Sequence, residues 1–98
     1  MSSYKLLPEA ERDLENIWLY TAQEWGVEQA MSYVDELNAC FQNLNEHAKF
    51  SRLRTEFTPP VYICRCNHHL IVYLENDSYI AVVRILHEKM DIDGQLEQ

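Results

Sequence analysis

The chain has 98 residues and a mass of 11.6 kDa, which suits one domain (residues 1–98) and excludes a multidomain enzyme or an α/β barrel. Its hydrophobic content of 47%, with two glycines and three prolines, is typical of a globular fold and excludes disorder. Sixteen acids against eight bases give a net charge of −8. We therefore expect no direct nucleic-acid binding over a broad surface, because such binding begins by neutralising phosphates.

The first half of the chain is predicted to be mainly helical. A short β-prone run at residues 3–7 ends at Pro8, a residue that suits the first turn of a helix. Two apolar stripes at helical spacing follow, separated by Gly26 and Val27, so we expect two helices that form an antiparallel hairpin. The stripes are Ala10, Leu14, Ile17, Trp18, Thr21 and Trp25, then Ala30, Val34, Leu37, Phe41 and Leu44. This pattern places Trp25 in the core.

The second half is predicted to be mainly strands. Residues 45–60 are polar with scattered apolar positions, and we expect a long loop that drapes over the core. Three β-prone runs follow at residues 61–66, 69–75 and 79–87. Asn67 and His68 fit a two-residue hairpin turn, and residues 88–98 are expected to be a flexible or partly helical tail. The predicted fold is an α+β domain of order β-α-α-β-β-β, with a helical hairpin packed on one face of a small antiparallel sheet.

The three cysteines are interpreted as reduced thiols that bind no metal. With no apolar signal sequence at the N-terminus and no membrane-length apolar run, we expect a cytoplasmic protein with reduced thiols. Cys64 and Cys66, with His68 and His69, invite a metal site, but structural zinc sites favour a C-x₂-C spacing. A disulfide between Cys64 and Cys66 is disfavoured because a strand holds the two side chains too far apart. We therefore expect no metal and no cofactor.

Four segments in this order resemble the ParE branch of the RelE/ParE toxins, over roughly residues 4–93. They are LLPEAERDLENIWLYTAQEWG, QAMSYVDELNACFQNL, HLIVYLEND and VVRILHEKMD. The resemblance implies the RelE/ParE-like fold and a bacterial type II toxin that a cognate antitoxin protein neutralises. It further implies growth arrest by poisoning of DNA gyrase. Two alternatives stay open: a ribosome-dependent mRNA endoribonuclease of the RelE type, and a toxin fold retained only as a binding module.

The candidate target-binding residues lie in and after the last strand. Arg84 matches the recurrent arginine of VVRILH, so the resemblance implies that it contacts the toxin's target; the alternative is an arginine at the sheet margin paired with a helix acid. Strict alternation would place Ile80, Val82, Arg84 and Leu86 on one face of the strand. The predicted target-binding set is Arg84, His87, Glu88, Lys89, Met90 and Asp91.

The ribonuclease alternative would use the few basic and imidazole groups of the second half, which are Arg65, His69, Arg84 and His87. A histidine can act as general acid or base near neutral pH. Cleavage of RNA also needs the phosphate charge stabilised, and so small a basic cluster in an acidic chain offers little of that. No catalytic residue is therefore expected.

Antitoxin contacts are predicted on the outside of the helices. Trp18 lies at the edge of the first stripe, Tyr20 falls off it, and Met31 and Tyr33 flank the second. Exposed aromatic and methionine side chains beside an apolar groove suit a docking segment, although they are also ordinary on helix surfaces. Because the helices are acidic, docking must rely on apolar grooves or on an antitoxin segment that is less acidic than is usual in this family.

Overall fold

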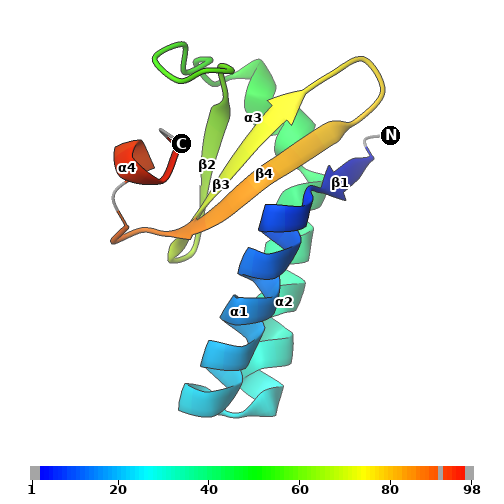
Figure 1. Ribbon diagram of the computed structural model, residues 1–98. Helices are drawn as coiled ribbons and strands as arrows, with labels where there is room; N and C mark the ends of the chain where they lie inside the picture. Colours follow the sequence, from blue (N-terminus) through cyan, green and yellow to red (C-terminus); the bar gives the residue numbers. More distant parts are fainter. Residues whose placement is uncertain (1–2, 91, 97–98) are drawn as a thin grey trace.

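The structure is a computed structural model that describes residues 3–90 and 92–96, and it confirms the predicted α+β architecture (Figure 1). The elements in chain order are β1 Tyr4–Leu6, α1 Pro8–Trp25, α2 Val27–Gln42, α3 Leu44–Lys49, β2 Tyr62–Cys66, β3 His69–Glu75, β4 Ile80–His87 and α4 Ile92–Leu96. Pro8 opens α1, as its missing N–H allows. Gly26 alone separates α1 from α2, with a positive φ of 98° that favours glycine. The expectation of a loop over residues 45–60 is wrong for its first part, where α3 forms a short separate helix.

The sheet has the order β1-β4-β3-β2. β2, β3 and β4 form an antiparallel meander, and β1 pairs with β4 in parallel, opposite Ile80–Val82 only. The predicted turn between β2 and β3 is confirmed, and Asn67 adopts a φ of 55°, which asparagine tolerates.

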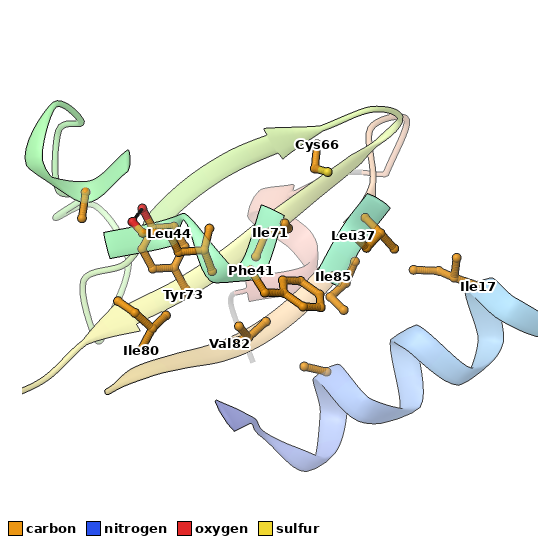
Figure 2. Close-up of a cluster of buried hydrophobic side chains, with 12 residues drawn as sticks. Ile17, Leu37, Phe41, Leu44, Cys66, Ile71, Tyr73, Ile80, Val82 and Ile85 are labelled. Carbon is orange, nitrogen blue, oxygen red and sulfur yellow. Dashed lines mark hydrogen bonds between the residues drawn. The ribbon is translucent and has the colours of Figure 1, made fainter. Parts of the chain in front are cut away.

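The main core lies between the helical hairpin and one face of the sheet. Figure 2 shows Ile17 of α1 and Leu37 and Phe41 of α2 gathered in one cluster with Ile71 and Val82 of the sheet. The stripe residues of both helices supply this core up to Ile17 on α1, which is the last buried residue of that helix.

A β-bulge changes which residues of β4 face the helices. Val72 pairs with Arg84 and Tyr73 pairs with Val82, so Val83 has no opposite residue. Ile85 consequently faces the helices with Val82, whereas Leu86 belongs to the cluster on the opposite face. The expectation that Leu86 shares a face with Ile80 and Val82 is wrong, because alternation is broken at the bulge.

The opposite face of the sheet is covered by the chain that follows α3 and by α4. Val72 and Leu86 are fully buried there, under Phe57 of the loop and under Ile92 and Leu96 of α4. Within residues 88–98, α4 therefore supplies apolar cover to the sheet.

The helical hairpin is longer than the sheet that it covers. Its closed end, where α1 passes into α2, projects beyond the sheet (Figure 1). Trp25 lies at this end with 73% of its surface exposed, so its predicted place in the core is wrong. No helix of the described residues is long and apolar enough to cross a membrane.

A disulfide joins Cys40 of α2 to Cys66 at the end of β2. The expectation that all thiols are reduced is therefore wrong in this structure. Cys64 is a half-buried free thiol whose burial raises its pKa. The pairing was missed because only fold geometry brings Cys40, on a helix, beside the strand.

Candidate functional site

A cleft of about 910 Å³ separates the projecting half of the helical hairpin from the end of the sheet. One wall carries Tyr20 and Trp25 of α1 with Tyr33 and Glu36 of α2. The other wall is the β2–β3 turn together with the C-terminal arm, a name used here for His87–Met90. The cleft thus brings four of the predicted target-binding residues to the same place as Tyr20 and Tyr33. The predicted Asp91 lies outside the described residues.

Arg84 is held by Asp13 of α1, a residue that lines this cleft. Its guanidinium donates to Asp13 through Nε at 2.7 Å and Nη2 at 3.1 Å, and Glu9 lies 3.6 Å away. Asp13 also accepts the backbone N–H of Ile85 at 2.9 Å. That N–H has no strand partner because β1 ends opposite Val82. The hydrogen bond to Asp13 raises the pKa of Arg84, so the structural interpretation of this arginine is the one that the geometry favours.

Arg65 is paired in a similar way at the other wall. Its Nη2 donates to Glu88, and the second carboxylate oxygen of Glu88 accepts from His68 Nδ1 at 2.8 Å. These contacts tie the β2–β3 turn to the C-terminal arm. The hydrogen bond from His68 lowers the pKa of Glu88, which remains a carboxylate near neutral pH.

A half-buried cluster of rings lies between the two walls. Tyr33 Oη is 2.6 Å from His69 Nδ1 and accepts the backbone N–H of His68 at 3.3 Å. The rings of His69 and His87 meet edge to face, with centroids 5.2 Å apart. Burial, with the nearby charge of His87, lowers the pKa of His69 from 6.5 to about 4. Burial also raises the pKa of Tyr33, so both groups are neutral at physiological pH.

The four residues of the ribonuclease alternative are therefore only partly assembled. His69 and His87 are adjacent, as an acid–base pair would require. Arg65 and Arg84, however, each carry a carboxylate partner, and the structure leaves neither guanidinium unpaired to neutralise a phosphate. The arrangement fits contact with another molecule better than RNA cleavage.

The four predicted antitoxin residues lie on two surfaces, not one. Trp18 lines a second groove of about 430 Å³, called here the outer groove, together with Leu6 of β1, Leu14 and Leu19 of α1 and Val34 of α2. Met31, 56% exposed, lies one helical turn before Val34 and extends this apolar strip along α2. Tyr20 and Tyr33 belong instead to the cleft, and Tyr33 is half-buried and hydrogen-bonded.

The metal interpretation of the C-x-C pair has no support in the geometry. Cys66 is bonded to Cys40, and His68 and His69 are engaged by Glu88 and Tyr33. In the described residues, no three His, Cys, Asp or Glu side chains converge as metal ligands.

Sequence reasoning missed three residues that shape the cleft. Asp13 and Glu36 are two of many acids on the helices, and the sequence pattern does not indicate that Asp13 is the one that contacts β4. Helical spacing places Trp25 in the core because it indicates on which face of the helix a residue lies, but not where the sheet opposite that face ends. Its position next to Gly26, at the end of the hairpin, was the available signal.

Comparison with known proteins adds a family to this geometry. A family model for the ParE toxin of the type II toxin–antitoxin system parDE matches residues 4–92. Toxin ParE of Escherichia coli is 37% identical over 97 residues, which are 98% of this chain and 94% of that protein. Toxin ParE1 of Caulobacter vibrioides is 31% identical over 96 residues, which are 98% and 99% of the two chains. A solved structure described as the chromosomal ParDE TA system from P. aeruginosa has a similar fold, with a TM-score of 0.74, 21% identity, and coverage of 89% of this chain and 96% of that chain.

Proposed function

Because the chain belongs to the ParE toxin family of type II toxin–antitoxin systems, we propose that it arrests growth by binding and poisoning DNA gyrase. In the neutralised state it is part of a hetero-oligomer with a cognate antitoxin protein. It acts in the cytoplasm and has no catalytic chemistry of its own.

The state of the two arginines carries this proposal. Arg84 is bound by Asp13 and Arg65 by Glu88, and His69 is neutral near pH 7 because of its lowered pKa. A ribonuclease needs free cations around the scissile phosphate, whereas a protein-binding inhibitor needs a surface. The C-terminal arm offers such a surface, with Met90 47% exposed beside Lys89.

The antitoxin is proposed to dock on the outer groove. Trp18 and Leu19 border it, and the strip continues to Met31, so an amphipathic segment finds apolar contact along both helices. Glu11 and Glu15 also line the groove, which disfavours the acidic segment that is common among antitoxins of this family. Binding there should depend on buried apolar area and vary little with added salt.

Two assays in parallel test the proposed target. The purified protein is added to gyrase supercoiling and cleavage reactions, and separately to ribosomes translating a defined mRNA. We expect inhibition of gyrase and intact mRNA. Specific mRNA cuts with gyrase unaffected would instead assign the protein to the RelE-type ribonucleases. The adjacent His69 and His87 would then be the acid–base pair.

The proposed antitoxin contact is tested with the protein encoded beside this chain. Trp18→Ala and Met31→Ala should weaken the complex, and Phe50→Ala, an exposed aromatic outside both the groove and the cleft, should not. Affinity that falls steeply with salt and ignores Trp18→Ala would contradict docking on this groove.

A further inference from the structure

The helical wall of the cleft carries large side chains that the domain itself does not use. Tyr20 is 64% exposed and Trp25 is 73% exposed, and Met90 faces the same cleft from the C-terminal arm. Within the described residues, none of these three side chains makes a hydrogen bond, ion pair or ring contact. Tryptophan, tyrosine and methionine are enriched where proteins bind one another, and an exposed cluster of them beside a cavity marks such a surface.

The geometry explains why no other part of the described chain covers them. Ile17 is the last residue of α1 to be buried, and the helix continues past the end of the sheet to Trp25 (Figure 1). The C-terminal arm forms the opposite wall, but about 910 Å³ remains open between the two. This volume is large enough to admit side chains of a second polypeptide.

The charged side chains of the cleft indicate what kind of molecule can bind in it. Among the side chains of α1 and α2 that line the cleft, Asp13 and Glu36 are acids and none is a lysine or arginine. Asp13 and Glu88 are neutralised by Arg84 and Arg65. Among the residues that the structure describes, Glu36 has no such partner, and its carboxylate stays available inside the cleft.

One more acid lies near the cleft, and a single cation lines it. Glu24 lies one helical turn beyond Tyr20 on the same face of α1. Lys89 is the one cation among the side chains that line the cleft, all of them in the described part of the chain. A phosphate backbone would be repelled by this wall, whereas an arginine or lysine side chain would be attracted to it.

We propose that the cleft between Trp25 and the C-terminal arm is the surface that grips the toxin's target, and that its occupant is a polypeptide segment bearing a basic side chain. The basic group pairs with Glu36, and apolar side chains of the segment pack on Tyr20, Trp25 and Met90. This inference rests on the proposed function in one respect, that the target is a protein. It extends the contact from the C-terminal arm to the tip of the helical hairpin.

The experiment uses the full chain and matched pairs of variants. Trp25→Ala is compared with Phe50→Ala, which removes an aromatic side chain that is 89% exposed outside the cleft. Glu36→Gln is compared with Asp35→Asn, the neighbouring exposed acid of α2 that does not line the cleft. All four positions are at the surface, and circular dichroism with thermal melting confirms that each variant is folded.

Three quantities are measured for each variant: growth arrest after induction, the toxin concentration that half-inhibits gyrase supercoiling, and antitoxin binding. Trp25→Ala should raise the inhibitory concentration by about 30-fold or more, as loss of a central interface anchor does. Glu36→Gln should raise it several-fold at low salt and less at high salt, because charge attraction is screened. Both controls should stay within about twofold of wild type, and antitoxin binding should be unchanged in all four.

The outcomes separate this inference from the proposed function. If wild-type toxin leaves gyrase untouched but Trp25→Ala and Glu36→Gln still abolish growth arrest, gyrase is the wrong target and the cleft remains the site. If gyrase is inhibited equally by wild type and Trp25→Ala, the cleft is not the target surface. Loss of antitoxin binding with full toxicity would assign the cleft to the antitoxin. Loss of an mRNA-cleaving activity in Trp25→Ala would show that the occupant is RNA, and each of the last three results overturns the inference.

Discussion

Removal of either partner from the Arg84–Asp13 pair should unfold the protein more readily without removing a target contact. Both side chains are largely buried, with 18% of Arg84 and 15% of Asp13 exposed. Asp13→Ala leaves the guanidinium with only the distant, exposed Glu9 and leaves the N–H of Ile85 unpaired. Breaking a buried pair in this way costs about 3–5 kcal/mol, and the residual exposure places this case near 3 kcal/mol. In a domain of this size that is a fall in melting temperature of roughly 12–24 °C.

The assay is urea unfolding followed by circular dichroism and tryptophan fluorescence, for both single variants and the double variant. Arg84→Ala should cost a similar amount, and the double variant should cost less than the sum, with a coupling energy of about 1.5–3 kcal/mol. Glu9→Ala is the control and should change stability by less than about 1 kcal/mol, because its carboxylate is exposed. If Arg84→Ala cost under about 1 kcal/mol and the folded variant failed to bind the target, the pair would be incidental and Arg84 would be a contact residue.

Three further outcomes follow from the structure. Reduction of the disulfide, or Cys40→Ser, should lower the free energy of unfolding by about 3.5 kcal/mol. This is the loop-closure entropy that a bond across 26 residues, from Cys40 to Cys66, removes from the unfolded chain. Equal urea midpoints with and without reductant would contradict this prediction. Since burial lowers the pKa of His69 from 6.5 to about 4, the folded state binds fewer protons than the unfolded state in that window, so stability should fall as pH drops from 6.5 toward 4. The ceiling of this loss is about 3 kcal/mol, reduced to about 1–2 by solvent at the half-buried ring, and His69→Asn should flatten the profile. Ile92→Ala and Leu96→Ala should each cost about 1–2 kcal/mol, because both side chains cover a buried face of the sheet; wild-type urea midpoints for both would mean that α4 is only loosely attached.

The fold was largely predictable because its determinants are local. Two helical stripes separated by a glycine define the hairpin, and alternating β-branched runs separated by Asn67 and His68 define the meander. What was missed depends on contacts between distant segments. The bulge at Val83 and the bond between Cys40 and Cys66 arise from how strands and helices meet, and no local spacing records them.

The candidate site was predictable in composition but not in arrangement. The resemblance to ParE toxins pointed to His87 and its neighbours, and the structure places these beside Tyr20 in one cleft. It could not indicate that Arg65 and Arg84 are neutralised, because their partners lie 23 and 71 residues away in sequence. The difference matters for function, since the same residues with free guanidiniums would suit RNA, and with carboxylate partners they do not.

The exposure of Trp25 and the location of the cleft have one physical cause. α1 has 18 residues, a length of about 27 Å at 1.5 Å per residue, and its burial in the sheet core ends at Ile17. The eight residues that follow pack against α2 but face no sheet, so apolar side chains on their outward face add little to stability. An apolar stripe that continues where the core has ended is unfavourable in solution unless another molecule covers it. The length of the hairpin thus divides one helix: residues up to Ile17 supply the core against the sheet, and Tyr20 and Trp25 beyond it are left exposed.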